Sequence, residues 1–179
     1  MKAWEKSRDQ SSAEKMYTLL CRMLDLESDT VESMSPGIDV YNRLLKACSI
    51  TPRQTLEEKS AWKDPLAIAI DTFGKLRGPN GPKTGPSHAS YAYMFLTCGK
   101  HMSRDDPRRI ELARKLFQQC CRDGQVTSLV IETFGTAVPH SVFNNELGIS
   151  KDEGRMIRVQ GHMEGLPMEW KRNVQTKEK

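Results

Sequence analysis

Long apolar stretches are missing from this sequence, and aromatic residues are few. No run approaches the roughly 18 consecutive apolar residues that a membrane-spanning helix needs, so we expect no membrane partner. Hydrophobic residues make up 37% of the 179-residue chain, aromatic residues 7% and charged residues 28%. This balance is typical of a helix-rich soluble protein with one core and a large surface for that core.

Disulfide and metal-ligand spacings are also missing. The five cysteines, Cys21, Cys48, Cys98, Cys120 and Cys121, are an odd number and form neither a disulfide framework nor a C-x-x-C pair. Three of them lie on helical apolar faces, which indicates small core residues in a reducing compartment. The four histidines are scattered without paired ligand spacing. We therefore expect no metal site and no other cofactor.

Catalytic motifs are missing as well. The chain has no nucleophile motif, no Gly-rich phosphate loop and no zinc-deaminase signature. A metallonuclease would need several aspartates converging on a divalent metal. Asp105 and Asp106 are the only adjacent aspartates, and they lie in a polar insertion beside arginines. We expect no catalytic activity and no small-molecule substrate.

An internal repeat is the strongest feature that is present. Residues 91–98 restate residues 41–48 fifty positions later, and both read Tyr-x-x-apolar-apolar-x-x-Cys. These positions fall at i, i+3, i+4 and i+7, which is one face of a helix. In a second pairing, Ile68, Ala69 and Phe73 match Leu112, Ala113 and Phe117, each 44 positions apart.

A repeated helix pair predicts an all-α fold. One pair cannot bury its apolar face alone, so repeated pairs stack into an α-α superhelix, a solenoid of helical hairpins. We expect that fold here, followed by a mostly irregular C-terminal tail. The expected units are a partial first repeat (1–34), two full repeats (35–87 and 88–128), a terminal half repeat or cap (129–148) and a polar tail (149–179) with an ordered motif at Leu166–Val174.

Proline and glycine mark the expected helix ends. Pro65 is well placed as the first residue of a helix that ends at Gly78. A later helix is expected from Arg108 to Arg122. Another should run from Leu129 to Val138 and stop at Pro139, without a clear second helix after it.

The first residues show no targeting segment. Residues 1–12 lack the apolar core of a secretory signal. They also contain both acidic and basic residues, unlike an Arg-rich, acid-poor transit peptide. Residues 2–7 are similar to the end of a first helix, and a second helix should begin at Ala13 with Ser12 as its N-cap. We expect the chain to open within a repeat, with Met1 an internal methionine of a longer product.

These units resemble pentatricopeptide repeats. Residues 40–45, Val-Tyr-Asn-Arg-Leu-Leu, match the opening of that family's first helix, and residues 90–95 match it less well. Residues 113–117 resemble its Ala-x-x-Leu-Phe pattern, although the insertions depart from the usual unit of about 35 residues. Residues 120–126 and Leu166–Val174 are similar to the C-terminal part of such proteins from diatoms and related algae.

The resemblance implies a function. Members of the family bind single-stranded RNA in mitochondria or chloroplasts and support processing, stability or translation of transcripts, with other RNA-processing proteins as possible partners. Each repeat reads one base through two or three side chains. By this resemblance, Asn42 and Ser87 are the base-reading pair of the first full unit, a combination that the family uses for cytosine. Ala92 and Ser128 hold the same positions in the second unit.

Two kinds of alternative stay open. Arg43, Lys46 and Lys100 are candidates for RNA backbone contacts, since the net charge of +4 suits a polyanion, but they also fit a solvated surface. Asn42 also fits an ordinary helix residue that caps local backbone groups.

The alternative function is a tetratricopeptide-like scaffold that holds a protein segment without RNA. A basic groove favours RNA, and a mixed or acidic groove favours a peptide.

Overall fold

The computed structural model describes residues 11–29, 36–53, 63–148 and 165–174. Within these ranges the chain forms seven α-helices and one short 3-10 helix and contains no β-strand, which confirms the all-α prediction. The expected helix end at residues 2–7 lies outside the described residues. The helices are α2 (Ser11–Asp29), α3 (Ile38–Ile50), α4 (Pro65–Arg77), α5 (His88–His101), α6 (Pro107–Arg122), α7 (Ser128–Ala137) and α8 (His140–Leu147), with the 3-10 helix η2 at Met168–Lys171.

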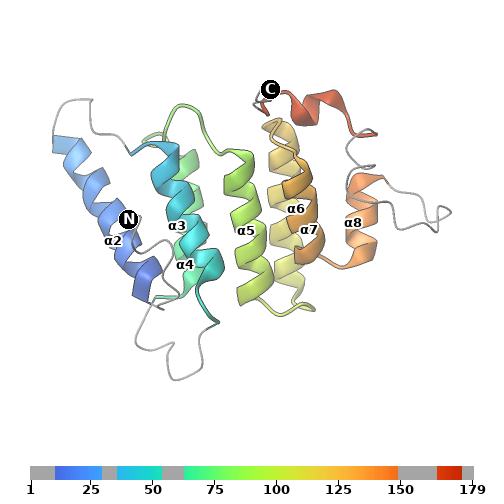
Figure 1. The fold of residues 1–179 in the computed structure, drawn as a ribbon, viewed down its shortest axis with the longest axis horizontal. Coiled ribbons are helices and arrows are strands. Elements are labelled where there is room, and N and C mark those ends of the chain that lie inside the picture. Colours follow the sequence, from blue (N-terminus) through green and yellow to red (C-terminus); the bar gives the residue numbers. More distant parts are fainter. Residues whose placement is uncertain (1–10, 30–35, 54–62, 149–164, 175–179) are drawn as a thin grey trace.

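The helices pack as neighbours from α2 at one side of the molecule to α8 at the other (Figure 1). Helix α5 packs against both α3 and α7, and these contacts are the most extensive between elements. Helices α2, α4 and α6 pack against the helices of this central row. The helices α3, α5 and α7 all begin at the same end of the molecule, where the last described segment also lies.

The repeated pattern builds the core. Each copy of the pattern, at 41–48 and at 91–98, contributes a tyrosine, two apolar residues and a cysteine. All eight residues are 0 or 1% exposed, which confirms the predicted apolar faces. The rings of Phe73 and Tyr91 meet edge to face with centroids 5.2 Å apart. Phe117 stacks on Phe134 at 4.3 Å. Aromatic residues, although few, therefore join successive helices inside the core.

Helices α4 and α6 begin in the same way. The carboxylate of Asp64 accepts a hydrogen bond from the Leu66 backbone N–H at 3.1 Å. The carboxylate of Asp106 accepts one from the Arg108 backbone N–H at 2.9 Å. In both cases a proline follows the capping aspartate as the first helical residue. The prediction of a helix start at Pro65 is confirmed, and α6 begins one residue before the expected Arg108.

Two helix predictions are wrong. Helix α2 begins at Ser11, so Ser12 lies inside the helix and is not its N-cap. Helix α8 follows Pro139, where no further helix was expected. It has no fully buried residue, which explains the weak sequence signal, and it packs the Phe143 ring 5.9 Å from that of Phe134.

A buried arginine joins α6 to the end of α7. The side chain of Arg109 is 5% exposed and donates to the backbone carbonyls of Ala137 at 2.8 Å and Thr136 at 2.7 Å. It also donates to the carbonyl of Met102 at 3.4 Å. The last carbonyls of a helix lack intrahelical donors and carry partial negative charge, so a cation there is favourable. Burial lowers the pKa of Arg109, but the group stays protonated.

We predict that Arg109→Ala lowers the free energy of unfolding by about 3 kcal/mol, because the carbonyls at the end of α7 lose their charged donor. Arg109→Lys should lose less, since it keeps the charge but not the fork of donors. Urea unfolding followed by circular dichroism measures this. The control is Arg108→Ala, because the Arg108 side chain is 84% exposed and its loss should cost much less stability than the loss of Arg109. Equal losses for the two alanine variants would contradict this role.

Candidate functional site

A wide cleft of about 1100 Å³ opens where the first turns of α3 and α5 meet the last residues of α4 and α6. The connector from Gly78 to Ser87 forms one wall, and Arg172 and Asn173 contribute from the C-terminal segment. Prolines of the connector supply apolar surface, whereas side chains of the helix ends supply polar groups. The cleft therefore combines apolar and hydrogen-bonding surface, as ligand sites usually do.

Close packing holds the connector against the end of α4. The Gly81 N–H donates to the carbonyl of Gly78 at 3.0 Å, which closes a turn. A Cβ at position 81 would lie 2.5 Å from the Leu76 carbonyl oxygen and 2.8 Å from that of Lys75. Only glycine fits this approach, so the wall of the cleft follows the helix end closely.

Asn42 and Ser87, the expected base-reading pair, lie in this cleft and are in direct contact. The Asn42 amide nitrogen donates to the Ser87 hydroxyl at 3.2 Å, and its amide oxygen accepts from the Ser90 hydroxyl at 2.6 Å. The Ser87 N–H in turn donates to the Ser90 hydroxyl at 3.0 Å. Asn42 thus bonds across to α5, and these bonds fix the orientation of its amide.

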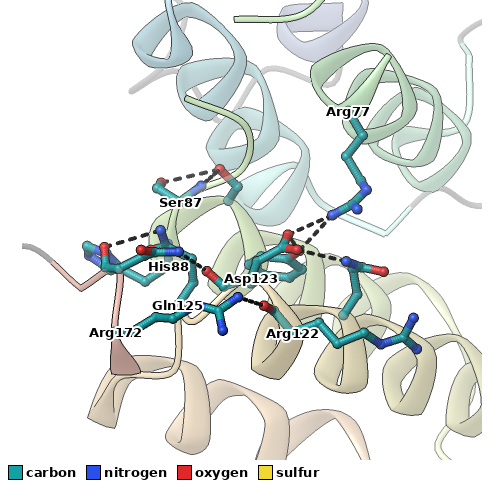
Figure 2. A network of polar contacts seen from close by, with 11 residues as sticks. Arg77, Ser87, His88, Arg122, Asp123, Gln125 and Arg172 are labelled. Carbon is teal, nitrogen blue, oxygen red and sulfur yellow. Dashed lines mark hydrogen bonds and ion pairs between the residues drawn. The ribbon is translucent and has the colours of Figure 1, made fainter. Parts of the chain in front are cut away.

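Asp123 joins three helices at the edge of the cleft. Its carboxylate accepts from the Arg77 guanidinium of α4 at 2.7 Å, from the Tyr91 hydroxyl of α5 and from the Gln119 amide of α6 at 2.8 Å. The Arg77 guanidinium also donates to the Tyr91 hydroxyl at 3.0 Å. Figure 2 shows Arg77 pointing toward Asp123 above the end of α6. Because the carboxylate accepts from all three helices, it fixes their ends relative to one another.

These contacts set the pKa of Asp123. Burial alone would raise it, but the hydrogen bonds from Tyr91, Gln119 and Arg77 outweigh burial and hold the pKa below its usual value. For Tyr91, burial and the bond to Asp123 raise the pKa. Both groups therefore keep their charge states at neutral pH, with Asp123 ionised and Tyr91 protonated.

The cleft carries an excess of basic groups. Among the described residues, Arg77, Lys83, Arg122 and Arg172 line it, against two acidic residues, Asp39 and Asp123. Arg77 is neutralised by its ion pair with Asp123. The side chains of Lys83, Arg122 and Arg172 are exposed, and they supply ammonium and guanidinium donors to an anionic ligand.

The other predicted site residues lie elsewhere. Ala92 is 1% exposed in the core, so its side chain has almost no surface for a base. Ser128 is exposed at the start of α7 and is outside the cleft lining of the described chain. Arg43 and Lys46 are half-buried on α3. The Lys100 ammonium donates to the Ile50 carbonyl at 2.7 Å, where it caps the end of α3 away from the cleft.

Sequence reasoning missed Lys83, Arg122 and Arg172. They come from a connector, a helix end and the C-terminal segment, so helical spacing does not relate them. The available signal was the pair of motifs at 120–126 and Leu166–Val174, which supply Arg122 and Arg172. The two motifs are far apart along the chain, so the sequence did not predict that they contact each other.

Known proteins offer no guide to this cleft, since no family model, curated protein or solved structure matches the chain. Among the described residues, no cluster of three or more His, Cys, Asp or Glu side chains is placed to hold a metal ion. None of the described helices is long and apolar enough to cross a membrane. The geometry and charge of the cleft therefore carry the functional proposal.

We predict that Asp123→Asn lowers the free energy of unfolding by about 2 kcal/mol at pH 7, because three donors lose a charged acceptor. The folded pKa of Asp123 is lowered, so its contribution is complete above the unfolded value of about 4 and is lost as pH falls through the folded pKa. The gap between wild type and variant should thus narrow below about pH 4.

Urea unfolding at a series of pH values measures this gap. The control is Glu111→Gln, which removes an exposed ion pair with Lys115 and should leave stability almost unchanged at every pH. A gap that stays constant into acid would mean that the Asp123 charge does not stabilise the fold.

Proposed function

We propose that this chain is part of a pentatricopeptide-type α-α superhelix that binds single-stranded RNA. Helices α3 and α5 carry the same buried pattern and pack against each other, as the first helices of successive repeats would. Helices α4 and α6 both begin with an aspartate cap followed by proline, and both bury an alanine and a phenylalanine four residues later, as the second helices would. In this proposal α2 belongs to a partial repeat, and α7 with α8 closes the end.

The single observation that carries the RNA proposal is the basic cleft that contains Asn42 and Ser87. Phosphate groups need cations and N–H donors, which the three exposed basic side chains supply. Base edges need an amide or hydroxyl held in fixed orientation, which the bonds of Asn42 to Ser87 and Ser90 provide. A single strand offers both kinds of group at once, because its bases are unpaired.

A peptide-binding scaffold is the alternative, and the lining disfavours it. A groove that holds neutral or basic protein segments would be mixed or acidic, whereas this one has more basic than acidic groups. By its resemblance to the family, we place the full-length protein in a mitochondrion or chloroplast. There it would support processing, stability or translation of transcripts.

We predict that Lys83→Gln combined with Arg122→Gln weakens single-stranded RNA binding about tenfold at low salt. Each lost phosphate contact lowers the slope of log affinity against log salt by about 0.7, so the double variant should lose about 1.4. Fluorescence anisotropy with short labelled RNAs across a salt series measures both quantities.

A matched control separates this effect from net charge. Arg104→Gln combined with Lys115→Gln removes the same charge from exposed positions outside the cleft lining. Its binding should stay within about twofold of wild type, because neither side chain lines the cleft. If both double variants lose affinity equally, binding is non-specific and the cleft is not the RNA site.

We predict that Asn42→Ala weakens binding to the preferred base, which the resemblance gives as cytosine, by about tenfold and leaves other homopolymers within about twofold. The reason is that alanine offers no hydrogen bond to a base edge. Anisotropy with four homopolymers measures the selectivity. A uniform loss on all four would show that Asn42 only positions α5 through Ser87 and Ser90.

A further inference from the structure

The segment from Gly165 to Val174 lies some forty residues after α6 in the chain but forms part of the cleft wall. It includes η2, which packs against α6 (Figure 1). Leu166 is 7% exposed, and the Trp170 ring meets the Phe117 ring edge to face at 5.9 Å. An apolar anchor at each of these two positions attaches the segment to the core.

Backbone hydrogen bonds join this segment to the turn between α6 and α7. The Val126 N–H donates to the Trp170 carbonyl at 2.8 Å, and the Asn173 N–H donates to the Gly124 carbonyl at 3.0 Å. The Asn173 side-chain amide donates to the Asp123 carbonyl at 2.8 Å. The turn that carries the Asp123 carboxylate is therefore also the docking site of the segment.

Gly124 lets the segment approach this closely. Its φ of 66° is in the left-handed region, and a Cβ there would lie 2.5 Å from Cγ of Arg172. The aliphatic part of Arg172 thus rests on Gly124. This contact directs the guanidinium to the Arg122 carbonyl, to which it donates at 2.7 Å at the cleft (Figure 2).

The contact leaves Arg172 able to bind a ligand. A guanidinium has five N–H donors, and the bond to the Arg122 carbonyl uses one of them. The side chain is exposed and lines the cleft, which the exposed Arg122 also lines. The Arg172 guanidinium is thus held at the cleft by the Arg122 backbone, whereas the Arg122 side chain extends away from it (Figure 2).

We propose that the C-terminal segment is a built-in wall of the RNA site, in which Arg172 binds the phosphate backbone of the strand beside Arg122. This inference rests on the proposed RNA-binding function and deepens it, because it assigns the backbone contact to a segment outside the helical repeats. Planar guanidinium groups suit phosphate oxygens, and docking onto Gly124 fixes one of them before the ligand arrives.

The test compares Arg172→Gln with Lys171→Gln in the full chain, by anisotropy with single-stranded RNA across a salt series. Lys171 is the neighbouring residue, carries the same charge and is outside the cleft lining. Arg172→Gln should weaken binding about fivefold at low salt and lower the salt slope by about 0.7. Lys171→Gln should stay within about twofold of wild type, and thermal melts should show both variants folded.

A second pair of variants tests the docking itself. Trp170→Ala removes the ring that meets Phe117, so it should weaken RNA binding at least as much as Arg172→Gln although Arg172 is still present. Trp170→Phe keeps an aromatic ring and should restore most of the affinity.

The outcomes separate the two proposals. If wild type binds RNA and Arg172→Gln matches Lys171→Gln, the segment is not part of the site, and the RNA-binding proposal survives without it. If wild type binds RNA and Trp170→Ala binds equally well, docking of the segment has no role in binding, and the inference is overturned. If wild type binds no single-stranded RNA, the proposed function fails and this inference fails with it.

Discussion

The carboxylate of Asp123 is the contact on which the cleft end of this protein depends. One side chain accepts hydrogen bonds from α4, α5 and α6, and the backbone of the same turn binds the C-terminal segment. The ion pair with Arg77 compensates for the desolvation of the carboxylate. Because four parts of the chain meet at this turn, the cleft beside it has a defined shape.

This arrangement separates two roles of the basic residues. Arg77 and Arg109 bind acceptors of the protein itself, since Arg77 pairs with a carboxylate and the buried Arg109 caps the end of α7. Lys83, Arg122 and Arg172 remain exposed at the cleft. Arg77 and Arg109 stabilise the fold, and the three other residues concentrate positive charge at one end of the molecule, where an anionic strand would be attracted.

The helical part could be predicted from the sequence, because burial follows local spacing. The stripe that begins at Tyr91 is buried as its period indicates, but the bond from its hydroxyl to Asp123 depends on a turn 32 residues later and has no local signal. Asn42 and Ser87 were placed by resemblance, and their contact became visible only in three dimensions. Lys100 is a candidate for an RNA backbone contact by sequence, but its bond to the Ile50 carbonyl, fifty residues earlier, has no local signal either.

The most direct measurement of the central claim is ultraviolet crosslinking of the chain to single-stranded RNA, with the crosslinked peptides identified by mass spectrometry. If the cleft binds RNA, crosslinks should fall on residues 78–89, on 122–126 and on 165–174. Crosslinks concentrated at residues 100–108, at the opposite end of α5, would contradict the account, as would crosslinks spread evenly over the surface.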